Sequence, residues 1–292
     1  ALPYAAALAG LLHANILLGH ITPTEPPAIL GQMFGMEASK RQAAQQAFAS
    51  EAPIYLRQQR EHIAIHGERV DTLHMTAPTV AGGLLQVETS RDIDLVFVAL
   101  GVYGQPGSMK VGKVADSLIR LGKAPVLVIP PEADAGAFPF ALRHIAVTLD
   151  GSPLAEQALG PLMGLLEQLR EYTSDMPVVT LLAVAEDDSI QPDYQAYLDA
   201  LCGTLAAQAQ FSHVQLRAKA IVGSAPGAIV GAMEHGIGDI THGGPLPVDV
   251  LMMTTHGRGG MTRWLLGSVA HYVLPRVHIP VLVTRPGSPV NL

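Results

Sequence analysis

The sequence predicts an α/β protein made of two tandem domains, each a parallel sheet covered by helices on both faces. Apolar runs typical of buried strands alternate with helical patterns along the chain, as in proteins with parallel sheets. The end of the first half is also repeated at the end of the second half. With 292 residues, 49% of them apolar, the chain is long enough for two domains that each bury a core.

The repeat is clearest in the last segment of each half. GKVADSLIRLGKAPVLVIP (112–130) aligns without a gap with GSVAHYVLPRVHIPVLVTR (267–285), at an offset of 155 residues. Upstream, DIDLVFVALGVYG (92–104) matches VDVLMMTTHG (248–257) after a two-residue slip. The shared order of strand, glycine loop, helix, proline and strand indicates a duplicated unit. We therefore predict a first domain at 1–131, a linker at 132–140 and a second domain at 141–292.

The first half opens on ALPYAAALAGLLHANILLGH (1–20), which predicts a buried amphipathic helix that runs into a strand, NILLGHI (15–21). His13 and Asn15 interrupt the apolar run and no basic leader precedes it, so we expect neither a signal peptide nor a membrane span. A span would also need about 20 apolar residues.

The second half shows the alternation in full. Strands are predicted at 144–150, 178–187, 214–223, 248–255 and 280–286, and helices at 152–169, 192–210, 224–236 and after the glycine loop. The first half has no counterpart of the strand HIAVTLD (144–150). Such a strand would lie in the middle of the sheet, so we expect residues before Ala1 to supply it in the natural protein.

Composition excludes some functions. A net charge of -7 and a pI of about 5.9 argue against a protein that binds nucleic acid through broad electrostatics. The single cysteine, Cys202, excludes a disulfide framework and a cysteine-based zinc site. A reducing cytoplasm is the simplest location.

A glycine-rich loop, MMTTHGRGGMTRWLLGS (252–268), directly follows an apolar strand. Ligands bind at the carboxyl ends of strands in open α/β sheets, and the exposed amides of Gly257, Arg258 and Gly259 can form an anion-binding concavity. A tight turn without a ligand is the alternative interpretation. Arg258 would either contact a phosphate or lie in solvent.

The next helix begins directly after this loop. Gly267, Ser268 and Val269 open it, and unpaired amides at a helix start favour a phosphate. The Ser268 hydroxyl can donate to the same anion.

Three segments, LDGS (149–152), MTTHGRGGMTRWLLGSVAHYVL (253–274) and IPVLVTRP (279–286), resemble the universal stress protein family. The resemblance covers the whole second repeat and, more loosely, the first. The family's nucleotide signature is Gly-x2-Gly-x9-Gly-[Ser/Thr]; Gly257 and the Gly267–Ser268 pair match it, while Thr254 replaces the first glycine. The resemblance implies two Rossmann-like (adenine nucleotide alpha hydrolase-like) domains of five parallel strands, the first lacking its first strand here. It also implies binding of ATP, ADP or AMP, with Mg²⁺ held through the phosphates.

The resemblance also assigns residues to this site. It implies that Asp150 contacts the nucleotide, that Thr148 faces the adenine or ribose, that the Val184 backbone reads the adenine edge and that Met253 packs on the base. Asp150 could instead cap the helix that follows it, or serve both purposes. His256 is expected to be structural rather than a catalytic base, because no paired carboxylate or nucleophile lies near it in the sequence.

The replacement of glycine by Thr254 has two possible consequences. It is mild if the backbone there stays extended and damaging if a positive φ is required.

The first repeat contains GSMKVGKV (107–114), which resembles a Walker phosphate loop. Val114 replaces the hydroxyl residue that binds magnesium, and the repeat pairs Gly112–Lys113 with Gly267–Ser268. We therefore interpret it as a diverged form of the second-repeat loop, in which Lys110 and Lys113 could still hold an anion.

Three further features complete the sequence-based expectations. PVLVIP (125–130) and PVLVTR (280–285) are apolar edge strands that should pair as an intramolecular pseudo-dimer, with a further homodimer possible. EHIAIHGE (61–68) places His62 and His66 four residues apart, but without a third ligand we expect no metal.

The extra loop at 235–247 has no functional explanation from the sequence. It enters at the amino end of the following strand, opposite the expected nucleotide site. A flexible surface insertion is expected.

The leading hypothesis is a nucleotide-binding module of the cytoplasm in which ATP orders the glycine loop and changes the surface that a protein partner sees. One alternative is a slow ATPase or phosphotransferase, although the loop supplies no local base or metal-binding carboxylate. The other is an interaction scaffold with an empty site.

Overall fold

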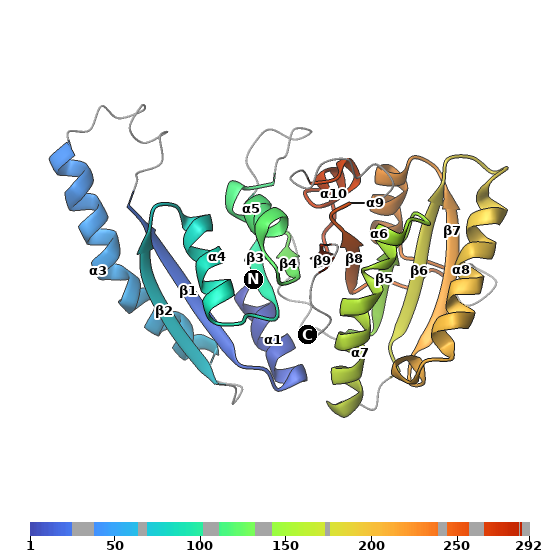
Figure 1. The fold of residues 1–292 in the computed structure, drawn as a ribbon, viewed down its shortest axis with the longest axis horizontal. Helices are drawn as coiled ribbons and strands as arrows, with labels where there is room; N and C mark the ends of the chain where they lie inside the picture. Colours follow the sequence, from blue (N-terminus) through green and yellow to red (C-terminus); the bar gives the residue numbers. More distant parts are fainter. Residues whose placement is uncertain are drawn as a thin grey trace. The chain divides into compact units, whose positions relative to one another are not determined.

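The structure is a computed structural model that describes residues 1–24, 38–63, 69–101, 111–131, 142–172, 176–238, 244–256, 266–285 and 287, without the side chains of 38–48 and 210. The predicted linker at 132–140 lies outside these ranges. The chain forms two compact units, Leu2–Ile93 and Asp94–Leu292, the second of which includes Ala1 (Figure 1). Within the described ranges, no helix is long and apolar enough to cross a membrane.

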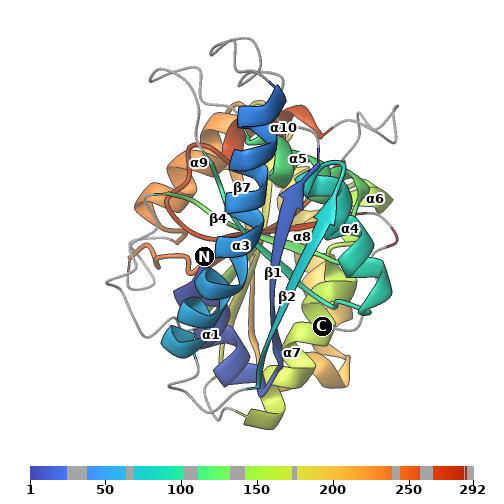
Figure 2. The ribbon, with the colours of Figure 1, turned by 90° about the vertical axis from the view of Figure 1, so that its left-hand side faces the viewer.

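The Leu2–Ile93 unit is built on two parallel strands. Strand β1 (Ile16–Pro23) pairs along its whole length with β2 (Val70–Ala77). Helices α1 (Leu2–Leu12) and α3 (Ala38–Ile63) pack on one face of this pair, and α4 (Val80–Ser90) packs on the other (Figure 2). The helix and strand predicted for residues 1–21 are confirmed.

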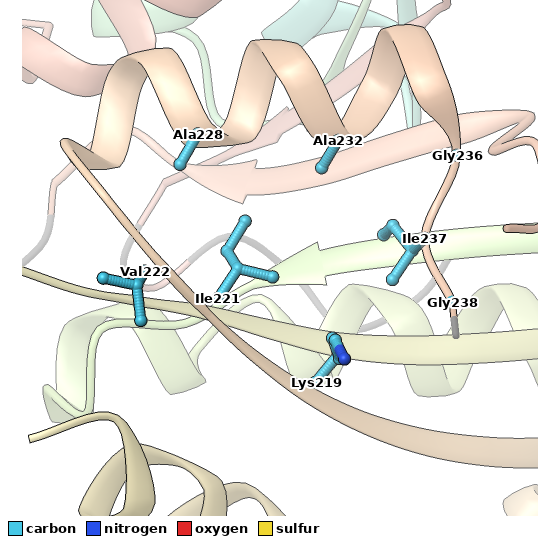
Figure 3. A pocket seen from close by; sticks show the side chains of 8 residues that line it. All are labelled: Lys219, Ile221, Val222, Ala228, Ala232, Gly236, Ile237 and Gly238. Carbon is cyan, nitrogen blue, oxygen red and sulfur yellow. The ribbon is translucent and has the colours of Figure 1, made fainter. Parts of the chain in front are cut away.

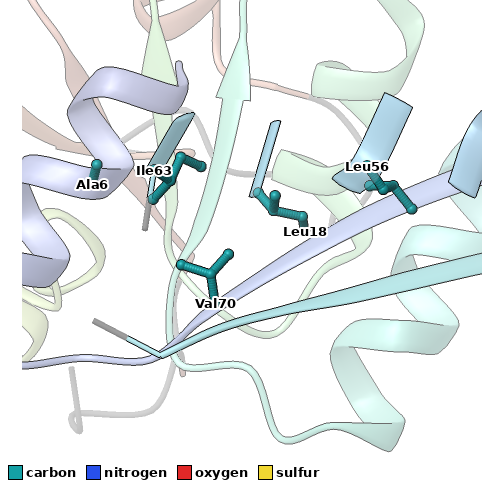
Figure 4. Packing of buried hydrophobic residues seen from close by; sticks show 5 residues of the cluster. All are labelled: Ala6, Leu18, Leu56, Ile63 and Val70. Atoms are coloured by element: carbon teal, nitrogen blue, oxygen red, sulfur yellow. The ribbon is translucent and has the colours of Figure 1, made fainter. Parts of the chain in front are cut away.

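Side chains of alternate strand residues fill the two faces of this small sheet, as strand geometry requires. Leu18 and Val70 meet Leu56 and Ile63 of α3 and Ala6 of α1 (Figure 4). On the opposite face, a second cluster forms under α4; its buried members are Ile21, Ala77 and Val87.

The Asp94–Leu292 unit contains a seven-stranded sheet with the order β3-β4-β9-β8-β5-β6-β7. Its strands are β3 (Val96–Ala99), β4 (Val126–Ile129), β5 (His144–Thr148), β6 (Val178–Ala185), β7 (Gln215–Val222), β8 (Val250–Thr254) and β9 (Val281–Thr284). Its helices are α5 (Lys113–Leu121), α6 (Pro153–Glu156), α7 (Leu159–Tyr172), α8 (Gln191–Ala206), α9 (Ala225–His235) and α10 (Ser268–Val273), with a short 3-10 turn, η2 (Ala209–Phe211).

The second repeat forms the five-stranded parallel sheet that the sequence predicts. Strands β9, β8, β5, β6 and β7 are neighbours in that order, and each pair is parallel. Helices α7 and α8 lie on one face of the sheet and α9 on the other (Figures 1 and 2). The helix predicted at 152–169 is two helices, α6 and α7, because Pro161 lacks an N–H and would clash with the carbonyl of Gln157 in a continuous helix.

The strands of the first repeat belong to two different sheets. In the second repeat, β5 pairs with both β6 and β8 and so joins the two halves of the sheet. No described strand of the first repeat corresponds to β5, so β1–β2 and β3–β4 share no strand.

The last strands of the two repeats pair with each other, as predicted. Strands β4 and β9 are antiparallel, with Val126 opposite Val283 and Val128 opposite Val281. All four valines are at most 2% exposed. The two apolar edges therefore cover one another and join the repeats in one continuous sheet.

The strand register corrects the alignment of the repeats. Val96 pairs with Val126 in the first repeat, and Leu251 pairs with Val281 in the second. Leu251 lies 155 residues after Val96, and Val281 lies 155 residues after Val126. The hydrogen bonds from Leu100 N to Ile129 O (2.8 Å) and from Thr255 N to Thr284 O (2.9 Å) follow the same offset. The two-residue slip assumed for β3 and β8 is therefore wrong, because one offset describes both strands and the helix that follows.

Candidate functional site

The predicted site residues gather at the carboxyl edge of the second-repeat sheet. Thr148 ends β5, Thr254 ends β8, and Val184 is the penultimate residue of β6. The Thr148 hydroxyl donates to Met252 O at 3.3 Å, which ties β5 to β8 at this edge. Met253 is 3% exposed and belongs to the sheet interior. Of the predicted residues, Gly257, Arg258 and Gly259 lie outside the described ranges.

The backbone of Val184 is directed toward the site. Leu149 N donates to Leu182 O at 2.9 Å. The last residue pair of the β5–β6 ladder is Thr148 with Leu182. Peptide groups of alternate residues in a strand face the same neighbour, so the N–H and C=O of Val184 also face the β5 side. They lie beyond the end of that ladder, where a ligand at the sheet edge could reach them.

Asp150 takes part in a chain of hydrogen bonds that starts α6. Its Oδ1 accepts from Ser152 N at 2.9 Å and from the Ser152 hydroxyl at 2.6 Å. Ser152 is the N-cap residue, and its Oγ accepts from Ala155 N at 3.2 Å. Asp150 thus holds the capping serine in place, and the N-cap itself is Ser152 rather than Asp150. Its contact with a nucleotide stays a prediction.

The residues after β8 are held by their own side chains. The Thr254 hydroxyl donates to His256 O at 2.7 Å, and Thr255 Oγ1 lies 2.9 Å from His256 Nδ1. Thr254 is a strand residue, and the non-glycine residues with positive φ in the described part of the chain are His13 and Asp92. The replacement of the family's glycine by Thr254 is therefore the mild case, because the backbone stays extended.

Gly267 closes the loop against the end of β8. Its N–H donates to Thr255 O at 2.8 Å, and it is the N-cap residue of α10. A Cβ at this position would lie 2.7 Å from Thr255 O, so the close approach of two backbone segments requires glycine. This contact places Ser268 and Val269, the first residues of α10, beside the end of β8.

Sequence reasoning missed two threonines at this edge. Thr284 ends β9 opposite Thr254, is fully buried (0% exposed), and its Oγ1 has no hydrogen-bond partner among the residues described. Thr255 is 2% exposed. The signal was present in the repeat itself, because PVLVTR has Thr284 where PVLVIP has Ile129.

A second polar cluster lies at the opposite edge of the sheet, at the start of β5. His144 is 4% exposed; its Nδ1 lies 2.8 Å from Pro247 O and its Nε2 lies 2.8 Å from Thr180 Oγ1. Burial lowers the pKa of His144, and a neutral ring that donates from Nδ1 and accepts at Nε2 satisfies both bonds. Asp249 Oδ2 accepts from the backbone N–H groups of Arg143 (2.9 Å) and His144 (2.8 Å). This cluster anchors the segment after the 235–247 insertion.

The first repeat and the histidine pair were the other candidates. Lys113 begins α5 and Gly112 is its N-cap, with the same backbone conformation as Gly267. Lys110 and His66 lie outside the described ranges. His62 Nδ1 lies 2.8 Å from Gln58 O within α3. No group of three metal-ligating side chains occurs in the part of the chain that the structure covers.

The sequence matches the profile of the Universal stress protein family over residues 1–130 and again over residues 141–285. Among solved structures, the chain is similar to a universal stress protein from Archaeoglobus fulgidus DSM 4304, with 16% identity and a TM-score of 0.62, over 97% of this chain and 93% of that chain. It is also similar to a protein from Pseudomonas aeruginosa UCBPP-PA14 that is assigned to the same family, with 13% identity and a TM-score of 0.62, over 98% of this chain and 88% of that chain. At these identities the structural likeness shows a shared fold, and the two profile matches show the family. The chain therefore belongs to the universal stress protein family and carries two of its domains in tandem.

Proposed function

We propose that the second repeat binds an adenine nucleotide, ATP foremost, at the carboxyl edge of β5, β6 and β8, and that this binding acts as a switch for a protein partner in the cytoplasm. The first repeat, for which we keep the boundaries 1–131, serves as a degenerate companion domain. In this proposal Mg²⁺ enters with the phosphates, and the protein binds the nucleotide without turning it over.

One observation carries the proposal. The two repeats share one register, yet the second has polar groups where the first has apolar ones. At the offset of 155, Thr254, Thr255 and Thr284 replace Ala99, Leu100 and Ile129. Buried polar groups at a strand end are costly unless they serve a structure or a ligand, and the Thr284 hydroxyl lacks a described partner.

The geometry supports distinct roles around a nucleotide. The peptide groups of Val184 would hydrogen-bond the adenine edge. The Ser268 hydroxyl, which Gly267 positions beside the end of β8, would donate to a phosphate. A few charge-assisted hydrogen bonds, each contributing about 1.5–3 kcal/mol, would give an affinity in about the micromolar range.

The first experiment is to denature freshly purified protein and to identify the released nucleotide and its amount per chain. We expect one adenine nucleotide per chain, or one calorimetric ATP site in the presence of Mg²⁺. Ser268→Ala should weaken ATP binding about tenfold. Lys113→Ala at the equivalent position of the first repeat is the matched control and should leave the affinity unchanged.

The other outcomes distinguish the alternatives. Two nucleotides per chain would show that the first repeat also binds. No nucleotide, and no binding of added ATP, would refute the proposal and leave an interaction scaffold. Sustained release of ADP would indicate an ATPase.

A further inference from the structure

A cleft of about 240 Å³ opens between β7 and α9, on the last strand of the sheet. Figure 3 shows Ala228 and Ala232 directed from α9 toward Lys219 and Ile221 of β7, with Ile237 beyond the end of the helix. The volume is below the roughly 300 Å³ at which pockets for drug-sized ligands begin. The cleft is therefore too small for a nucleotide and suits a smaller molecule.

The cleft exists because of the residues that α9 presents to β7. Ala228 and Ala232 are four residues apart and so lie on one side of the helix. The larger Ile229 and Met233 are buried instead, and α9 packs against β6 and α10. Two methyl side chains are too short to fill the space above Ile221, so the gap stays open.

The far end of the cleft is built by the base of the 235–247 insertion. Ile237 and Leu246 form an antiparallel bridge with two N–H···O bonds of 2.9 Å. Gly236 has a φ of +82°, and a Cβ there would lie 2.6 Å from Leu246 O, so this turn requires glycine. Ile237 is 6% exposed and lines the cleft. The expectation of a flexible surface insertion is wrong for this base, which is a defined wall of the cleft.

Lys219 is the charged residue among the described residues that line the cleft. Lys219 is half-buried in the middle of β7, opposite Leu182 of β6. Within the described ranges, the Lys219 ammonium has neither a carboxylate partner nor a hydrogen bond; the ion pairs found there join Arg69 to Asp71 and Arg120 to Asp116. A cation beside apolar side chains favours an anion that carries an apolar tail.

We propose that this cleft is a second ligand site, separate from the nucleotide edge, and that it takes a small aliphatic carboxylate. The carboxylate pairs with Lys219, which lies between Ile221 and Ile237 (Figure 3). The alkyl chain lies between Ile221 and the two alanines. The base of the insertion, which nucleotide binding does not explain, thus has a function as the wall of this site.

The test is calorimetric titration of the full chain with octanoate, and with octanol as the uncharged analogue of the same length. We expect one saturable octanoate site per chain and binding of octanol at least about tenfold weaker, because octanol cannot pair with the ammonium. Saturating ATP should leave octanoate binding unchanged, since the two sites are distinct.

Two kinds of variant locate the site. Lys219→Met keeps the unbranched shape and most of the length of the side chain and removes its charge. It should weaken octanoate binding about tenfold while leaving octanol binding unchanged. Ala228→Leu and Ala232→Leu fill the cleft and should abolish both. Lys113→Met and Ala200→Leu, at exposed positions of α5 and α8, are the matched controls and should bind octanoate like the parent protein.

Each contrary result overturns the proposal. Absence of saturable octanoate binding up to its solubility limit would refute the site. Equal octanoate affinity of Lys219→Met and the parent would place binding elsewhere. Circular dichroism of each variant excludes loss of folding as the cause of lost binding.

Discussion

At the scale of single residues, the two repeats show why one glycine is fixed and another is less constrained. Gly267 and Gly112 occupy equivalent N-cap positions with almost the same φ, −57° and −62°. A Cβ at Gly267 would lie 2.7 Å from Thr255 O, whereas a Cβ at Gly112 would lie 3.3 Å from Gly101 O. Gly267 therefore packs more closely on Thr255 than Gly112 does on Gly101. The sequence motif places a glycine at both positions. It does not reveal this difference, which depends on sub-ångström packing.

We predict that Gly267→Ala destabilises the protein by about 1–3 kcal/mol and that Gly112→Ala costs clearly less. Both changes lose the same conformational freedom in the unfolded chain, so the difference between them reports the contact with the carbonyl. Urea unfolding of the two variants, followed by circular dichroism, measures it. Equal unfolding midpoints would show that the loop can move away from Thr255 at no cost.

At the scale of elements, the sequence was most informative where a strand or helix has a strong local pattern. Every strand of the second repeat was predicted, because apolar β-branched runs between glycine and proline leave little choice. The break between α6 and α7 was missed although Pro161 marks it. The pairing of β4 with β9 could be predicted because two exposed apolar edges of one chain can remove each other from water.

We predict that this pairing is essential for stability. Val281→Glu buries a carboxylate at a position that is 0% exposed, between β8 and β4. It should cost about 3 kcal/mol or more, since neither of these two strands contains a cationic residue that could pair with it. The Val281→Ala variant loses packing without adding a charge, so it measures the contribution of packing alone. Val222→Glu is the control, because Val222 ends the edge strand β7 and is 41% exposed; it should shift stability by at most about 0.5 kcal/mol. Similar unfolding midpoints for the two glutamate variants would contradict a tight β4–β9 contact.

At the scale of the whole molecule, the two halves of one duplicated sequence have become unequal. The fold class, the tandem arrangement and the edge of the candidate site followed from the repeat and its glycine loop. The separation of β1–β2 from β3–β4 could not be read from local patterns, because it depends on which strand lies between others. The cleft beside Lys219 also escaped prediction, since it results from small side chains on α9 and a distant bridge between Ile237 and Leu246.

This inequality predicts two levels of stability within one chain. Among the described strands, each strand of the β1–β2 pair has one hydrogen-bonded neighbour, whereas β5 and β6 each have two. A two-stranded sheet is marginal without further support, and amide exchange through local unfolding follows such differences. We expect amides of β1 and β2 to exchange with deuterium faster than those of β5 and β6, measured by mass spectrometry of peptic peptides. Burial alone does not explain such a result, because Leu18 and Val70 (8% exposed) are buried residues, as are Val179 and Ile145 (0% exposed). Equally slow exchange of all four strands would instead show that the chain unfolds as one cooperative unit.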